Sequence, residues 1–180
     1  MKLKEFLENN RQRIVERWFQ VIIETYPGDS ARFLTKDKDR FTNPVGHTFS
    51  NETRALFDIL LGGPNTDAAN ESIDRIIKIR AVQDFTPSQA VVFVFTLKDI
   101  IRESLRDEIS AHQLHDELED FCRDIDKLAL LIFDRYMECR EKINQIRLDQ
   151  LRQTSGRLHK RLNVSENKLN PEGDPTDDSI

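Results

Sequence analysis

Two histidines and a glutamate lie close enough in the sequence to hold a metal ion together. His112, His115 and Glu119 form the pattern His-x2-His-x3-Glu, and a single helix would present all three on one face. Asp116 and Glu117 add carboxylate oxygens nearby. The stretch is strongly polar, however, and the helix dipole favours acidic side chains in a first turn. An exposed helix start therefore explains these residues more simply, and we expect no bound metal or other cofactor.

The sequence lacks the residues that a haem site or a common catalytic motif would need. A proximal haem ligand would be an inward histidine on the helix before the most apolar one, but residues 66–82 contain no histidine. The inward positions there are Ile73, Ile76, Ile77 and Arg80. The sequence has no Glu-x-x-His pair, no Gly-x-Ser-x-Gly, no phosphate-binding Gly-x4-Gly-Lys-Ser/Thr and no His-Glu-x-x-His. We therefore expect a protein that is not an enzyme.

Positive charge gathers between residues 140 and 162, in a chain whose net charge is −5. Nucleic-acid phosphate or an acidic partner would fit such a stretch. The C-terminal part of a helix also favours cations, and an acidic chain without interleaved aromatic residues lacks the usual footprint of a nucleic-acid-binding protein. We expect no nucleic-acid partner.

Apolar residues recur at steps of three and four along most of the sequence, which predicts an all-α protein. A globin-like arrangement of about five helices with a long C-terminal helix fits their order, and an antiparallel helical bundle is the alternative. Periodicity does not separate these two topologies. The predicted helices cover residues 2–26, 44–61, 65–82, 87–109 and 114–162, with a short helix over 31–34 and a break over 110–113.

The stretch from Ala90 to Ile101 is apolar nearly all round, so the helix that carries it should be buried between others. It is shorter than the roughly 18 apolar residues of a membrane span, and no other stretch reaches that length. The N-terminus has acidic and amide residues where a signal peptide is apolar. Cys122 and Cys139 lie too far apart on one helix to form an intrachain disulfide, and a symmetric interchain bond is the alternative to free thiols. We expect a cytoplasmic protein with reduced thiols and no membrane insertion.

The last predicted helix would be about 73 Å long at the usual rise per residue, more than a small domain can bury. We expect a helical core over residues 1–113, with the first half of the helix 114–162 packed on it. The second half should pair with a second copy of the chain as a short parallel coiled coil, and a solvated extension ending near Thr154 is the alternative. Residues 163–180 should be a disordered acidic tail. The predicted dimer interface consists of Ile132, Tyr136, Ile143, Ile146, Leu151 and Leu158.

Residues 86–89 have the sequence of a helix start. Thr86 can cap the helix, Pro87 occupies its first position, and Gln89 falls where a capping box requires it. The surrounding residues 79–90, together with Asn43-Pro44-Val45 earlier in the chain, resemble the N-terminal domain of RsbRD-type regulators. These are RsbT co-antagonists, which act in bacterial stress responses. The residues that carry the resemblance are Asn43, Pro44, Arg80, Asp84, Thr86, Pro87 and Gln89.

The resemblance covers about residues 1–160 and implies a non-haem, globin-like sensory domain that dimerises. In such regulators a C-terminal helix leads into a STAS domain, which a serine/threonine kinase phosphorylates and which assembles into a stressosome. At the corresponding point this sequence becomes acidic, so it resembles a stand-alone version without the STAS domain. Similar stand-alone versions accompany the sulfite-reduction electron-transfer machinery of sulfate-reducing bacteria.

The sequence and this resemblance together lead to one preferred hypothesis. The chain is expected to be a non-enzymatic cytoplasmic sensory, regulatory or protein-interaction module that acts as a homodimer, with a regulatory kinase or STAS protein as its partner. The alternative is an accessory or assembly factor of a bacterial electron-transfer complex for sulfite reduction. A metal- or haem-binding redox protein is the least favoured alternative.

Overall fold

The computed structural model of the protein describes residues 2–26, 28, 31–32, 34, 41–62, 66–83 and 85–169, with side chains described up to residue 157 except for 66–69. The chain divides into two compact units, Met1–Arg140 and Glu141–Ile180. We call them the first and the second unit. The last helix contributes residues to both.

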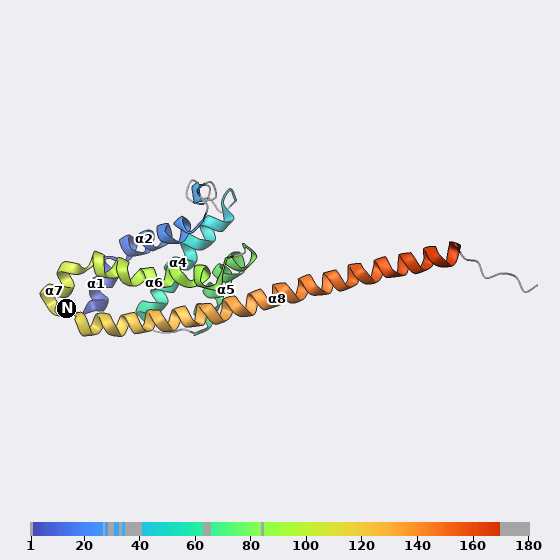
Figure 1. Cartoon of the computed structure of the whole chain (residues 1–180). Helices are drawn as coiled ribbons and strands as arrows, with labels where there is room; N and C mark the ends of the chain where they lie inside the picture. Colours follow the sequence, from blue (N-terminus) through green and yellow to red (C-terminus); the bar gives the residue numbers. More distant parts are fainter. Residues whose placement is uncertain are drawn as a thin grey trace, which may run out of the picture. The chain divides into compact units, whose positions relative to one another are not determined.

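The described residues are helical almost throughout, which confirms the all-α prediction and the long C-terminal helix (Figure 1). Ala31, Arg32 and Leu34 are also helical, within the short helix predicted there. The choice between globin-like and bundle topology stays a prediction. The helices are α1 (Leu3–Asn9), α2 (Arg11–Glu24), α4 (Pro44–Gly62), α5 (Thr66–Val82), α6 (Pro87–Ser104), α7 (Arg106–His112) and α8 (His115–Leu169).

Two helices that were predicted as single elements are each divided by one residue. Asn10 (φ −101°, ψ 9°) ends α1, and its side-chain amide donates to the Phe6 carbonyl that its own backbone N–H also uses, both at 3.0 Å. An asparagine side chain competes in this way with the helical hydrogen bonds of the backbone. Leu105 (φ −122°) separates α6 from α7, and its fully buried side chain lies in the core together with Ile109. The predicted break over 110–113 narrows to Gln113, whose φ of 53° ends α7.

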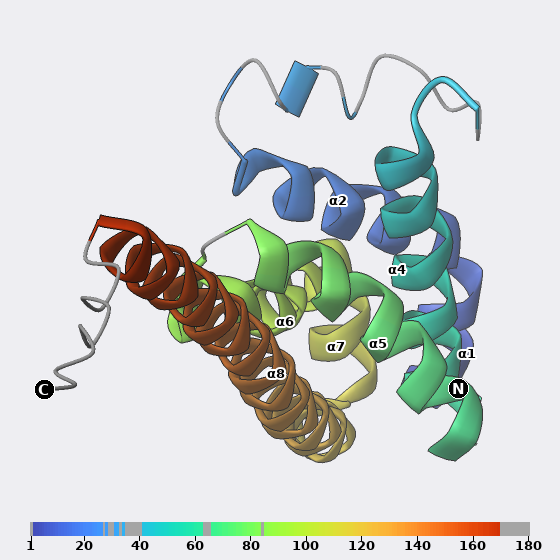
Figure 2. The same ribbon diagram turned by 90° about the vertical axis from the view of Figure 1, so that its right-hand side faces the viewer.

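The core of the first unit forms where α2 packs against α4 and α6. In Figures 1 and 2, α6 lies between α2 and the first part of α8, with α5 at its side. Trp18 of α2 is fully buried, and its ring stacks on that of Phe93 of α6 with centroids 6.1 Å apart. The Trp18 indole N–H donates to the Phe93 carbonyl at 2.7 Å, which satisfies the one polar atom of this side chain.

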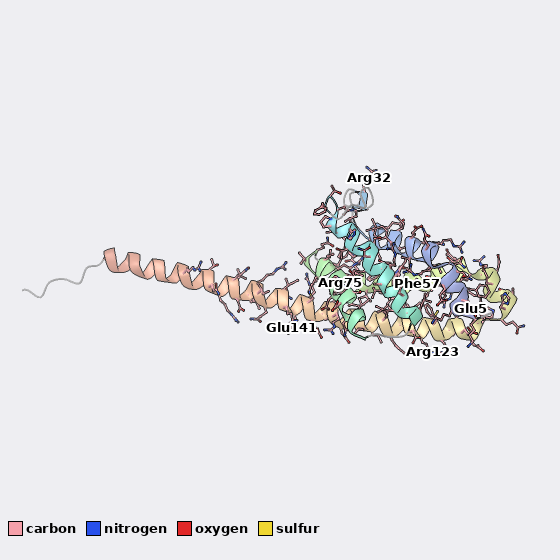
Figure 3. The ribbon with its side chains drawn as sticks, turned by 180° about the vertical axis from the view of Figure 1, so that it is seen from behind. Glu5, Arg32, Phe57, Arg75, Arg123 and Glu141 are labelled. Carbon is pink, nitrogen blue, oxygen red and sulfur yellow. The ribbon has the colours of Figure 1, made fainter. Side chains whose placement is uncertain are left out.

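A buried carboxylate joins α4 to α5. The Glu52 side chain of α4 accepts from Arg75 of α5 at 2.6 Å from Nε and at 3.0 Å from Nη2. Figure 3 labels Arg75 on α5 and Phe57 on α4. Such a bidentate pair fixes both distance and orientation between two helices. None of the helices in the described part of the chain is both long and apolar enough to cross a membrane.

Two residues of the predicted dimer interface are buried within their own chain, and the interface itself stays a prediction. Ile132 and Tyr136 are 1% and 0% exposed within their own chain, because the first unit covers this stripe of α8 farther than the sequence suggested. Ile143 is half-buried, whereas Ile146 and Leu151 are exposed in the second unit. The side chain of Leu158 lies outside the described residues. The helix also continues to Leu169, beyond the predicted end at Leu162, so the residues just after 162 are helical.

Candidate functional site

The proposed metal ligands do not converge. His112 is the last residue of α7 and His115 the first of α8, and the left-handed Gln113 between them breaks the single helix that the spacing assumed. The His112 ring packs on Phe6, with centroids 5.1 Å apart, while Glu119 lies 3.7 Å from Arg102. Among the described residues, no group of three or more histidines, cysteines and carboxylates is placed to hold a metal ion.

The predicted capping box at the start of α6 is present. The Thr86 hydroxyl accepts from the Gln89 backbone N–H at 3.3 Å, and the Gln89 side chain accepts from the Thr86 backbone N–H at 3.0 Å. Pro87 follows in the first helical turn, where its missing N–H costs nothing. Asp84, which belongs to the same motif, lies outside the described residues. The local sequence therefore fixes where α6 begins.

Asn43 precedes α4 as Thr86 precedes α6, and each is followed directly by a proline. Its side-chain oxygen accepts from the Gly46 backbone N–H at 2.8 Å, and its side-chain nitrogen donates to the Leu34 carbonyl at 2.7 Å. Asn43 is fully buried. One asparagine thus caps α4 and holds the segment before it against the helix.

Arg80, near the end of α5, is the most unusual residue of the core, because it is charged and fully buried. Its Nη1 donates to the Gln89 carbonyl at 3.0 Å. Its Nη2 donates to the Thr25 hydroxyl at 2.8 Å and to the Ile22 carbonyl at 3.5 Å. Thr25 and Ile22 belong to the C-terminal end of α2, where the helix dipole favours a positive charge.

Four aromatic rings from different parts of the chain surround the Arg80 guanidinium. Its Cζ lies 4.8 Å from the ring centroid of Phe93, 4.9 Å from Phe85, 5.6 Å from Tyr26 and 6.0 Å from Phe49. Each such cation–π contact contributes about 0.5–2 kcal/mol, more when water is excluded. The rings therefore offset part of the cost of removing this charge from water.

The hydrogen bonding of this cluster is incomplete. Arg80 has no carboxylate partner among the described residues, and neither its Nε nor the Tyr26 hydroxyl, both buried, has a hydrogen-bond partner there. Burial lowers the pKa of the Arg80 guanidinium. Burial also raises the pKa of Tyr26 to about 12, although the nearby Arg80 charge opposes this shift. The cluster therefore presents donors and a positive charge at neutral pH.

Residues 81–89, which include the end of α5 and the start of α6, are also bound by α8. The Tyr136 hydroxyl donates to the Phe85 carbonyl, and Arg140 Nη1 donates to the Ala81 carbonyl at 3.1 Å. We call residues 81–89 the α5–α6 corner. Arg80 contacts it from the core through Gln89, so the buried cation and α8 both hold the corner.

A group of large apolar side chains remains exposed where α6 and α8 lie side by side. The two helices are joined by a hydrogen-bonded ion pair, Lys98 to Asp126 at 2.6 Å. Farther along, five apolar residues are each at least 41% exposed, although the sequence predicted that α6 is buried all round. We call them the α6–α8 face, which consists of Val92, Phe95, Leu130, Phe133 and Met137.

The sequence carried a signal for this face that the prediction did not use. Leu130, Phe133 and Met137 follow one another at steps of three and four, beside the buried stripe that includes Ile132 and Tyr136. The two stripes together give α8 a wide apolar surface over these turns. Periodicity reveals such a surface but not which side of it the domain covers.

The family model described as "RsbT co-antagonist protein rsbRD N-terminal domain" matches residues 12–151, more than half of the sequence. The chain belongs to the RsbRD N-terminal domain family. Neither the curated proteins nor the solved structures gave a match. The matched range of this RsbRD N-terminal domain includes the Arg80 cluster, the α5–α6 corner and the α6–α8 face. Membership places the chain among regulatory modules.

Proposed function

We propose that this RsbRD N-terminal domain is a non-enzymatic sensory module that acts as a homodimer through its α6–α8 face. The exposure of that face is the observation that supports the proposal. Soluble monomers rarely leave several large apolar side chains exposed side by side. Full burial of one such side chain contributes about 1.5–3 kcal/mol, so five half-exposed ones offer a substantial driving force.

A two-fold symmetric dimer fits this surface, because in such a dimer the α6–α8 face of one copy packs against the same face of the other. The predicted contacts Ile143, Ile146 and Leu151 in the second unit would add to the interface as a coiled coil. The output of the module is a change in α8, which begins in the first unit and continues into the second. We expect another regulatory protein, such as a kinase or a STAS protein, to respond to this change.

Size-exclusion chromatography with light scattering tests the homodimer. The wild-type protein should be a dimer at micromolar concentration. Phe133→Asp places a charge in the face on both copies, and it should give a monomer. Because Phe133 is 41% exposed, the variant should keep its helical circular dichroism.

Gln12→Asp is the matched control. It introduces the same charge at an exposed position of the first turn of α2, where the helix dipole tolerates it. This variant should remain a dimer. A monomeric wild type, or a dimer that persists in Phe133→Asp, would overturn the proposed interface.

A further inference from the structure

We propose that Arg80 and Tyr26 bind one small inorganic monoanion inside the first unit, and that this anion is the signal of the module. The second clause rests on the proposed sensory function. The binding itself does not, because it follows from the unpaired donors and the charge of the cluster.

The first argument is the charge of Arg80. A guanidinium stays protonated in a protein core, and a buried charge without a counter-ion is strongly unfavourable. Among the described residues, the partners of Arg80 are two carbonyls, one hydroxyl and four rings, and all of these are neutral. An anion would supply the missing negative charge, which a water molecule would not.

The second argument is the set of unpaired donors. Arg80 Nε–H and the Tyr26 hydroxyl are both buried without a partner, and the Tyr26 ring centroid lies 5.6 Å from Arg80 Cζ. More than nine in ten buried polar groups in native proteins have a partner, and an ion or water is the usual explanation when the protein supplies none. An anion would be a common acceptor for these two donors.

The packing limits the size of the ligand. Ring centroids of Phe93, Phe85 and Phe49 lie 4.8, 4.9 and 6.0 Å from Arg80 Cζ, so a ligand that joins the guanidinium would have to be an ion of a few atoms. Halides and planar oxyanions such as nitrate and bicarbonate belong to this class. Larger anionic metabolites do not.

The position of the cluster suggests how binding would reach α8. Arg80 holds the Gln89 carbonyl at the α5–α6 corner, and Tyr136 and Arg140 of α8 hold two other carbonyls of the same corner. An anion that draws the guanidinium toward Tyr26 would change the first of these bonds. The corner and α8 would then respond together.

Thermal unfolding in matched sodium salts tests the binding. The full chain is compared in gluconate, which is too large for the site, and in chloride, bromide or nitrate at the same ionic strength. The melting temperature should rise with the logarithm of the small-anion concentration. Tyr26→Phe keeps the ring and removes one donor, so it should weaken the response about tenfold, as expected for one lost hydrogen bond to a charge. Arg80→Met should abolish the response.

Arg54→Met is the control for unspecific anion binding. Arg54 is exposed and lines an open cleft between α2 and α4, so its loss should leave the response unchanged. Crystals grown with bromide should show an anomalous peak within hydrogen-bonding distance of Arg80 Nε. Equal melting temperatures in gluconate and chloride, a full response in Tyr26→Phe, or a water molecule alone at this place would each overturn the proposal.

The same samples separate this proposal from the sensory one. A monomeric protein that still binds bromide at Arg80 would refute the homodimer and keep the anion site. A dimer without an anion response would refute the anion site and leave the dimer intact.

Discussion

Replacing Gly46 by alanine tests the local architecture at the start of α4. A Cβ atom at this position would lie 2.3 Å from Asn43 Nδ2, 2.4 Å from the Leu34 carbonyl oxygen and 2.8 Å from Asn43 Cγ. Real Cβ atoms essentially never approach other atoms this closely. The backbone carbonyl cannot turn away as a flexible side chain can, so the Asn43 side chain must leave its place.

The expected cost follows from the two hydrogen bonds of Asn43. Both bonds are buried, and losing them leaves the Gly46 N–H and the Leu34 carbonyl without partners. Each such orphaned group costs about 1–3 kcal/mol. Replacing glycine by alanine within a helix raises the free energy of unfolding by about 1 kcal/mol. The free energy of unfolding should therefore fall by about 3 kcal/mol.

Urea unfolding followed by circular dichroism measures this change. Gly62→Ala is the control, because Gly62 is the last residue of the same helix and a Cβ there meets no atom within 4 Å. It should be neutral or slightly stabilising. If Gly46→Ala instead stabilises the protein by the helix propensity alone, then Asn43 does not hold Leu34 against α4 and our account of this helix start fails.

Three other changes have defined outcomes. Trp18→Phe removes a buried indole and its bond to the Phe93 carbonyl, and it should lower the free energy of unfolding by about 2 kcal/mol in the same urea assay. Because the pKa of Tyr26 is raised to about 12, the unfolded chain loses this proton first. Tyr26 should therefore not affect the free energy of unfolding below pH 10. Between pH 10 and pH 12 the free energy of unfolding should fall, and it should fall less in Tyr26→Phe. Absorbance at 295 nm should show the late ionisation of Tyr26 directly. Gly156→Ala fills open space on α8, so helical content by circular dichroism should rise, with about 1 kcal/mol of added local stability against hydrogen exchange; a loss of helix would contradict the described α8.

The sequence allowed the starts of α4 and α6 to be predicted, because their signals are local. Pro44 follows its capping asparagine, and Thr86 and Gln89 form both bonds of the capping box. The division at Asn10 was missed, since one side chain competing with the backbone does not interrupt apolar periodicity. At Leu105 the apolar pattern also continues through the break.

The Arg80 cluster could not be predicted from local sequence signals alone. The spacing from Ile73, Ile76 and Ile77 predicted that Arg80 faces inward, and it is fully buried. Its aromatic surroundings come from Tyr26 just after α2, from α4, from α6 and from the α5–α6 corner, however, and only tertiary packing brings these together. The same holds for Ile132 and Tyr136, because which stripe of a helix a domain covers depends on its neighbours.

The α5–α6 corner is held at three backbone carbonyls by the side chains of Arg80, Tyr136 and Arg140. A carbonyl is the same in every amino acid, so this attachment does not depend on which residues occupy Ala81 or Gln89. These three attachments therefore constrain the path of the backbone and not the side chains at the carbonyl positions, whereas the capping box separately requires Thr86 and Gln89. We expect that exchanging the three donors into a related domain would transfer the geometry of the corner, whereas grafting the corner sequence alone would not.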